Sequence, residues 1–316
     1  MNFSHPRRVV VLILAGLLFL VALPAFAESA VPDFSDRSYA LPIDFSGGPE
    51  PSAEHLSEGV YEDSTIRVAI TDDRWENCRF WAADIVISDP SQLRTVSACQ
   101  DFSNNRKVMD PVKLAQHVNA IVALNGDSWG AGEKKGLGII LRQGRLIAAK
   151  LDERDKPNHH LMDILLIDED GDFHGIHVPA EGELDISTWE GKRLLNVLSF
   201  GPILVENGEP ISDFQGADRW MDMARDVGRQ RVCIAQVEPL HYKIICCAGP
   251  VRGSRGMTLE QFARLAAEQG VQTAYNLDGG DSTMLYFFGS KKVNKSGTSN
   301  VRSLWDIIYF VSAEGQ

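Results

Sequence analysis

The sequence of residues 231–247 is RVCIAQVEPLHYKIICC, in which two apolar runs, 231–237 and 242–247, flank a short polar turn. Both runs contain β-branched residues, which favour strands, and the short separation favours pairing as an antiparallel hairpin. This segment therefore predicts a sheet at the centre of the carboxyl-terminal half of the chain.

The same pattern recurs on both sides of this segment. Predicted strands 138–141 and 145–149 flank the tight-turn pair Gln143-Gly144, and a run over 197–205 closes at Asn207-Gly208. Further strands are predicted at 65–71, 80–88, 120–124, 163–167, 173–178, 274–277, 284–288 and 307–311, with a turn at Val293-Asn294.

Two helices have clear start signals. Asp110-Pro111 provides an N-cap and a first-turn proline for a helix that continues over 113–118. Thr258 and Gln261 form a capping box for a helix over 259–269 that ends at Gly270. Many hairpins and few helices predict an α+β fold: a strand-dominated single domain with a few helices packed on the sheet.

The acidic run DEDGD at residues 168–172 invites comparison with a calcium loop. An EF-hand requires a bidentate Glu at its twelfth position and a following helix, whereas that position is Pro179. A hairpin turn is the favoured interpretation.

The amino terminus has the layout of a secretory signal peptide. Arg7 and Arg8 precede an apolar run over residues 9–23, and Ala25-Phe26-Ala27 provides a small-x-small cleavage site. The run is shorter than the ~20 residues that span a membrane, so cleavage is favoured over an uncleaved anchor. We expect a signal peptide (1–27), a linker or N-terminal arm (28–63) and one domain (64–316), exported and without a stable membrane span after cleavage.

The charge balance excludes several classes of partner. Removing residues 1–27 leaves 29 of the 31 basic residues against all 43 acidic ones, a net charge of −14. Such a chain repels nucleic acid and anionic lipid at long range. An anionic substrate must then be held by a few local donors.

The five cysteines are odd in number and form no CxxC motif. If the 231–247 runs pair, a disulfide between Cys233 and Cys246 is one possibility and buried free thiols are the other.

Three polar junctions, each with at least one glycine, follow apolar strands, at 125–127, 249–258 and 276–283. Polar groups at strand ends are how a rigid sheet presents side chains to a substrate. In the last junction, Gly279-Gly280 allows close backbone approach, and Ser282 and Thr283 add hydroxyl groups, a combination suited to phosphate.

These junctions and their order resemble the phosphodiester glycosidase family. The resemblance is carried by RVCIAQ (231–236), SRGMTLEQFA (254–263) and NLDGGDSTM (276–284), supported by LNGDSW (124–129), SFGPILVENGE (199–209) and Arg302. It spans roughly residues 66–311, and five motifs in one order are more specific than any one of them. Asp281 departs from the pattern, because the family usually has a glycine or serine there.

The resemblance implies hydrolysis of a sugar-1-phosphodiester at its glycosidic C–O bond, with a phosphate-linked glycan or sugar phosphate as substrate. The site must then bind an anion and supply a carboxylate that activates water or attacks the anomeric carbon. We expect Asp278 to be that carboxylate and Arg231 to be the phosphate clamp, because a guanidinium grips phosphate at two points. The remaining expected site residues are Asp127 and Asp281 as further carboxylates, and Asn125, Asn276, Gly279, Gly280, Ser282, Thr283, Ser254 and Thr258 as substrate ligands.

Two alternatives stay open. A non-catalytic polysaccharide- or wall-binding module would keep the glycine loop and Arg231 without needing Asp278. No cofactor is expected, but Asp278 and Asp281 in a glycine turn are spaced to share a hard cation such as calcium.

Overall fold

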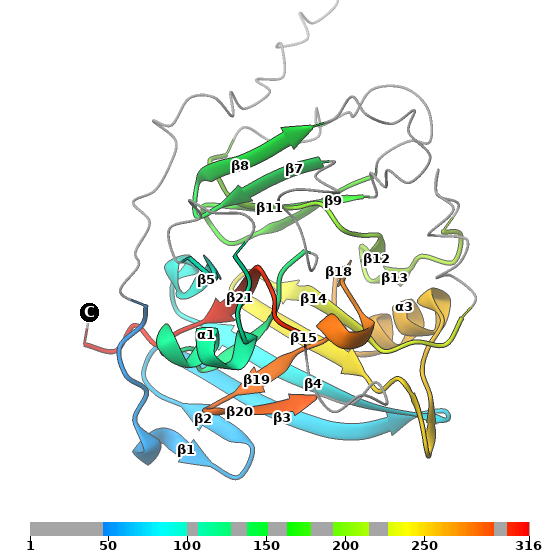
Figure 1. The fold of residues 1–316 in the computed structure, drawn as a ribbon, viewed down its shortest axis with the longest axis horizontal. Coiled ribbons are helices and arrows are strands. Elements are labelled where there is room, and N and C mark those ends of the chain that lie inside the picture. The colour runs from blue at the N-terminus through cyan, green and yellow to red at the C-terminus, as the bar shows by residue number, and fades with distance from the viewer. Residues whose placement is uncertain are drawn as a thin grey trace, which may run out of the picture.

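The computed structural model describes residues 47–99, 107–127, 138–150, 163–177, 192–214, 227–293 and 302–315, and this part of the chain is strand-dominated (Figure 1). The predicted signal peptide and most of the predicted arm lie outside the described residues. No helix in the described segments is long and apolar enough to cross a membrane.

The largest layer is a nine-stranded antiparallel sheet. Its order is β1 (Leu56–Ser57), β2 (Val60–Glu62), β3 (Ile66–Trp75), β4 (Cys78–Ile87), β15 (His241–Cys247), β14 (Arg231–Glu238), β18 (Thr273–Leu277), β12 (Ile203–Glu206) and β13 (Glu209–Pro210). The predicted hairpin at 231–247 is confirmed as β14 and β15, with Arg231 opposite Cys247. This hairpin lies at the middle of the sheet.

Two five-stranded sheets complete the core. One has the order β20 (Ser290–Val293), β19 (Leu285–Phe287), β6 (Val122–Asn125), β21 (Asp306–Phe310) and β5 (Leu93–Ser97). The other has the order β10 (Phe173–Ile176), β9 (Ile164–Asp168), β11 (Leu194–Leu198), β7 (Gly138–Arg142) and β8 (Arg145–Lys150). Both contribute to one apolar cluster with the nine-stranded sheet, in which Ile234, Leu124 and Leu165 are all buried. Shorter elements are a small hairpin, β16 (Pro250–Val251) and β17 (Ser254–Arg255), and three 3-10 turns, η2 (Ala53–His55), η3 (Pro90–Gln92) and η4 (Gly280–Ser282). The turns η3 and η4 lie where the chain passes from the nine-stranded sheet to the sheet that contains β6.

The two α-helices of the described segments cover outer faces. Helix α3 (Leu259–Glu268) packs Phe262 and Leu265 on the nine-stranded sheet, against Cys233 and Ile245. Helix α1 (Pro111–His117) packs its buried residues on the sheet that contains β6 and β21. Both predicted caps are confirmed: Asp110 accepts from the amide of Val112, and Thr258 and Gln261 form the capping box.

The run at 197–205 is two strands in different sheets. Strand β11 ends at Leu198, and β12 begins at Ile203 and pairs with β18. Between them Gly201 adopts φ +75° and Pro202 lacks an amide hydrogen, so neither sheet's ladder can continue through them. The predicted turn at Val293-Asn294 also differs, because Val293 belongs to β20 and the hairpin turns at Phe288-Gly289; Asn294 is outside the described residues.

Part of the predicted arm belongs to the sheet. Strands β1 and β2 fall within residues 28–63, and β2 pairs with β3. Tyr61 is buried and its ring lies 5.5 Å from that of Phe288. The sequence does not predict β2, because Tyr61 is its only buried side chain and its surroundings in the sequence are polar.

The acidic run forms a hairpin turn between β9 and β10, as predicted. The Oδ1 atom of Asp168 accepts from the amides of Asp170 and Asp172 at 2.9 and 3.0 Å. The carboxylate of Asp168 therefore closes the turn.

Of the two possibilities for Cys233 and Cys246, the disulfide does not form. Cys233 faces Ile245, and Cys246 faces Val232, so the two side chains lie on opposite faces of the sheet. All five cysteines are free thiols, which agrees with the other possibility.

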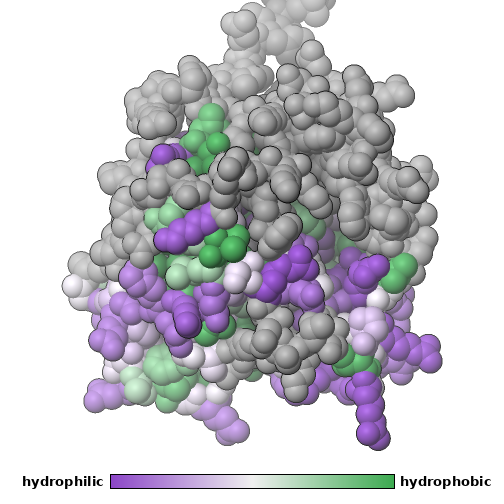
Figure 2. Space-filling model, viewed as in Figure 1, coloured by the Kyte–Doolittle hydropathy of each residue, from purple (hydrophilic) through white to green (hydrophobic). Residues whose placement is uncertain are grey.

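The coloured face in Figure 2 is largely hydrophilic. Among the described residues the exposed large hydrophobic side chains are Leu56, Val86, Val108 and Val227, which are scattered along the sequence. Isolated apolar side chains of this kind are ordinary for a protein surface.

Candidate active site

The predicted glycine loop is the connection between two sheets. Residues 278–284 leave the carboxyl end of β18 in the nine-stranded sheet and enter β19 in a five-stranded sheet. The 3-10 turn η4 occupies Gly280–Ser282. Side chains in this loop are consequently fixed relative to both layers.

Gly279 packs against the chain's own backbone. A Cβ atom at this position would lie 2.4 Å from the carbonyl oxygen of Gln230. The amide of Gly280 donates to the same oxygen at 2.9 Å, and Gly280 has φ +58°. The amides of Ser282 and Thr283 donate to Gly279 and Gly280. The close approach that Gly279-Gly280 allows is therefore made to the strand that begins at Arg231, and the Gly280 amide is already engaged.

Arg231 and Asp278 lie at neighbouring positions on adjacent strands. Val232 pairs with Leu277, so the next positions outward on β14 and after β18 are Arg231 and Asp278. The hydroxyl of Ser282 donates to Oδ2 of Asp278 at 2.5 Å. A short bond to an ionised acceptor is strong and fixes the orientation of the carboxylate. Asp278 is half-buried whereas Ser282 is fully buried.

The guanidinium of Arg231 is held by main-chain oxygens. Its Nε donates to Met257 at 2.7 Å and its Nη2 donates to Val227 at 3.1 Å. Arg231 is 5% exposed, and burial lowers the pKa of its guanidinium to about 10, so it remains charged at neutral pH.

Asn125 holds the loop at both ends. Its Nδ2 donates to the carbonyl of Asp278 at 3.0 Å, and its Oδ1 accepts from the amide of Met284 at 3.1 Å. Asn125 is buried at the end of β6. Its side chain thus positions the loop that carries Asp278, a contact with main chain and not with a ligand.

Asp127 belongs to a buried ion triad. Its Oδ2 lies 2.6 Å from Nη2 of Arg142, and the Nε of Arg142 lies 2.7 Å from Oδ2 of Asp306. The Oδ1 of Asp127 accepts from the amide of Ser199 at 3.1 Å. Burial raises the pKa of Asp127 above its usual value and that of Asp306 to about 6. Burial opposes the charge on Arg142, but the two carboxylates raise its pKa above the ordinary value.

The triad joins strands of two sheets, because Arg142 ends β7 while Asp127 follows β6 and Asp306 begins β21. Sequence reasoning missed Arg142 and Asp306. An arginine beside the tight turn Gln143-Gly144 has the local pattern of a solvent-exposed strand end, and nothing nearby in sequence marks it as buried.

The remaining predicted residues are held by structural contacts. Asn276 Nδ2 donates to Gly201 at 2.8 Å. Thr258 caps α3, and Ser254 Oγ lies 3.1 Å from Sγ of Cys78. The carbonyl of Asp281 accepts from the amide of Arg302 at 2.9 Å, which places the loop beside the segment before β21.

Three buried polar atoms around the loop have no hydrogen-bond partner within the described segments. They are Oε1 of Gln230, Oδ1 of Asn276 and Oγ1 of Thr283. Each belongs to a residue within two positions of Arg231, Asp278 or Ser282. Buried polar atoms are normally paired, so each of these three atoms is a candidate partner for water or a ligand.

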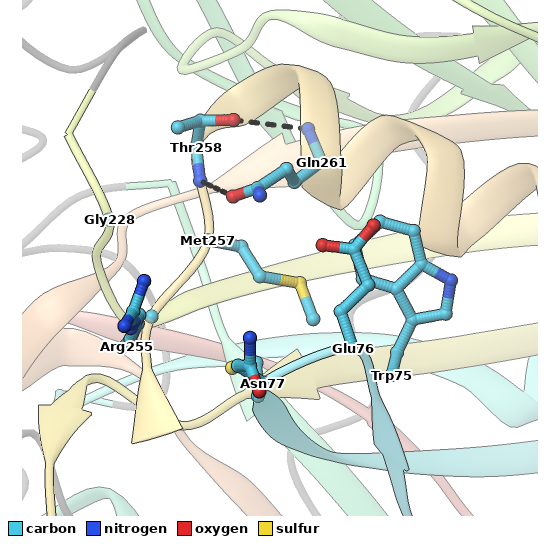
Figure 3. Close-up of a pocket in the computed structure, with 10 residues that line it drawn as sticks. Trp75, Glu76, Asn77, Gly228, Arg255, Met257, Thr258 and Gln261 are labelled. Carbon is cyan, nitrogen blue, oxygen red and sulfur yellow. Dashed lines mark hydrogen bonds between the residues drawn. The ribbon is translucent and has the colours of Figure 1, made fainter. Parts of the chain in front are cut away.

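A cavity of about 310 Å³ lies beside the amino-terminal end of α3 and the turn between β3 and β4 (Figure 3). Met257, whose carbonyl holds the guanidinium of Arg231, lies in its wall, together with Trp75, Asn77, Arg255 and Thr258. Across the described residues there is no group of three or more His, Cys, Asp or Glu side chains placed to hold a metal ion.

Comparisons with known proteins agree with the resemblance seen in the sequence. The model of the phosphodiester glycosidase family matches residues 118–311, more than half of the chain. No curated protein matches.

Solved structures share the fold. The catalytic domain of zebrafish N-acetylglucosamine-1-phosphodiester alpha-N-acetylglucosaminidase, auto-inhibited by its pro-peptide, matches with a TM-score of 0.57 at 17% identity, covering 84% of this chain and 87% of that one. A hypothetical protein from Synechocystis matches with a TM-score of 0.54 at 15% identity, covering 81% of this chain and 64% of that one.

Proposed function

The chain belongs to the phosphodiester glycosidase family, and we propose that it is an exported hydrolase that cleaves the glycosidic C–O bond of a sugar-1-phosphodiester in a glycan or cell-surface polymer. The placement of Arg231 and Asp278 at neighbouring strand positions carries this proposal. A buried cation and a carboxylate at adjacent strand ends would supply the pairing that an anionic sugar substrate requires.

Phosphate as the leaving group sets what the site must supply. A phosphomonoester leaves readily, so strong protonation by a general acid is less necessary than for an alkoxide. Arg231 would stabilise charge on the departing phosphate, and the buried setting strengthens that interaction relative to water. Oδ1 of Asn276 and Oγ1 of Thr283, which have no hydrogen-bond partner within the described segments, would bind the remaining polar groups of the substrate.

We assign the reacting carboxylate to Asp278. Asp278 would either activate water or attack the anomeric carbon, and the bond from Ser282 fixes its direction in both cases. Asp127 is not assigned this role, because both of its oxygens are committed to Arg142 and Ser199. Asp281 remains a second candidate carboxylate, beside the backbone of Arg302.

A panel of sugar-1-phosphate diesters tests the proposal. The mature protein should release a free sugar and a phosphomonoester from at least one member, and Asp278→Asn should remove turnover with little change in Tm. Asp281→Asn separates the two candidates: it should retain turnover if Asp278 is the reacting carboxylate, and loss of turnover in Asp281→Asn alone would transfer the role to Asp281. Binding of a diester without turnover by the wild-type protein would favour the non-catalytic module, and unfolding of Asp278→Asn would make Asp278 a structural turn residue.

Export rests on the signal pattern of residues 1–27. The protein recovered from outside the cytoplasm should begin at Glu28, which amino-terminal sequencing would detect. A mature protein that retains Met1 would contradict cleavage.

A further inference from the structure

Two cysteines lie on the same face of neighbouring strands next to Arg231. Cys247 of β15 faces Phe80 of β4, so Cys78 is its diagonal neighbour two residues further along. Cys78, Phe80 and Cys247 all belong to the cluster under α3, which places their side chains on one face. Arg231 is opposite Cys247 on the other side, on β14.

The two thiols have different surroundings. Cys78 Sγ lies 3.1 Å from Ser254 Oγ and 3.4 Å from the carbonyl of Ala248, while Cys247 Sγ lies 3.5 Å from the carbonyl of Arg229. The hydrogen bond from Cys247 lowers the pKa of Cys78 to about 7, whereas burial raises the pKa of Cys247 well above its usual value. Cys78 is therefore the thiol that ionises first, and thiolates are the attacking species in disulfide exchange.

Only one of the pair is reached from outside. Cys78 lines the cavity of about 310 Å³, together with Asn77 and Met257, whereas Cys247 is not among its lining residues. A small reagent that enters this cavity meets Cys78 before Cys247.

We propose that Cys78 and Cys247 form a dithiol–disulfide pair that is oxidised by a small-molecule disulfide entering the cavity at Cys78. The Cys78 thiolate attacks one sulfur of the reagent, forming a mixed disulfide and releasing the other half as a thiol after it takes up a proton. The Cys247 sulfur then attacks Sγ of Cys78, and the proton of Cys247 passes to the departing sulfur, which leaves as the second small thiol. The two cysteines lose two electrons and the reagent gains them, giving one protein disulfide and two small thiols.

The diagonal relationship makes this bond reversible. Diagonal neighbours in an antiparallel pair have Cα atoms roughly 7–8 Å apart, just beyond the range of an unstrained disulfide. Cys78 is the first residue of β4, directly after the Glu76-Asn77 turn, and it pairs with Trp75 at the end of β3. A bond closed in this way is strained, and strained disulfides are reduced more readily than structural ones.

Oxidation of the purified full-length mature protein by oxidised glutathione, followed by peptide mapping under non-reducing conditions, tests the proposal. The folded wild-type protein should lose the mass of two hydrogen atoms and yield a linked peptide pair containing Cys78 and Cys247, and dithiothreitol should restore the starting mass. Cys78→Ser and Cys247→Ala should each prevent the link. Cys233→Ala, a buried cysteine on the same face of the sheet, and Cys99→Ala, the more exposed thiol, should both retain it.

The wild-type mapping decides the question even if a variant fails to fold. A glutathione adduct that remains on Cys78 without closing to Cys247 would overturn the pairing. A link between any other two cysteines in the folded protein, or no reaction at all, would do the same.

Discussion

Asn125 donates a hydrogen bond to the carbonyl of Asp278 at 3.0 Å, although the two residues lie 153 positions apart in the sequence. The same side chain accepts from Met284, so one amide group holds the loop at both ends. The position of the proposed reacting carboxylate is thus set from a different sheet.

Asn125→Ala should lower both stability and turnover. The amide of Met284 loses its acceptor inside the core, which costs about 1–3 kcal/mol, and the loop that carries Asp278 loses its anchor. Thermal denaturation and kcat on a cleaved diester measure the two effects. A variant that loses stability but keeps the wild-type kcat would contradict the positioning role.

Ser282→Ala should reduce kcat by roughly 10- to 100-fold with a loss of only about 1 kcal/mol in stability. The hydroxyl orients the Asp278 carboxylate, and the substitution leaves the turn backbone intact. Ser97→Ala is the matched control, because Ser97 is also a buried serine, and it lies on β5. Equal effects of the two substitutions on kcat would argue against a role for Ser282 at Asp278.

Arg231→Lys should lower kcat/KM by about 10- to 100-fold, since an ammonium group keeps the charge but lacks the planar fork that grips phosphate. Steady-state kinetics measure this change. The neighbouring exposed Arg229 provides a control, and Arg229→Lys should retain wild-type kinetics. If Arg231→Lys only lowers the Tm, the guanidinium is a structural tie between Met257 and Val227.

The two loop glycines should respond differently to alanine. Gly279→Ala would place a Cβ atom 2.4 Å from the carbonyl of Gln230, and we expect a loss on the order of 3 kcal/mol or more in the free energy of unfolding. Gly280 has φ +58° with open space around it, so Gly280→Ala should cost only about 1 kcal/mol. Chemical denaturation of both variants checks this order, and a larger loss at Gly280 would contradict it.

Asp306 should make a distinctive contribution to pH dependence. Its pKa in the folded protein is about 6, above the unfolded value of about 3.9, so the folded state binds the proton more tightly. The contribution of Asp306 to stability therefore rises as the pH falls from 6 to 4. As the pH falls from 6 to 4, the wild-type protein should therefore gain on the order of 2 kcal/mol in unfolding free energy relative to Asp306→Asn. A difference that stays constant with pH would show that Asp306 remains ionised throughout.

Local signals were sufficient for most of the fold. Turn pairs such as Gln143-Gly144 and the Thr258–Gln261 capping box act within a few residues, and the structure confirms them. The break between β11 and β12 was not predicted, because the strands continue one apolar run and only their partners in distant segments separate them.

In the candidate site, too, local motifs marked some residues, whereas contacts between distant segments could not be predicted. Sequence motifs identified Asp278, Ser282 and Arg231, which the structure brings together at one end of β14 and β18. They did not reveal that Asp127 is bound to Arg142, since burial of an arginine depends on packing between two sheets. Nor did they show that Thr258 and Asn125 bind main-chain groups of the protein itself.

The segment 278–284 carries the proposed reacting carboxylate and is also where the chain passes from one sheet to another. Substitutions in this segment that change the proposed chemistry would also disturb the contact between the two sheets. We therefore expect few substitutions to be tolerated there. The exposed residues that line the cavity, Glu76, Asn77 and Arg255, lie outside this connection between sheets. Substitutions at these three residues should therefore be better tolerated than substitutions within 278–284.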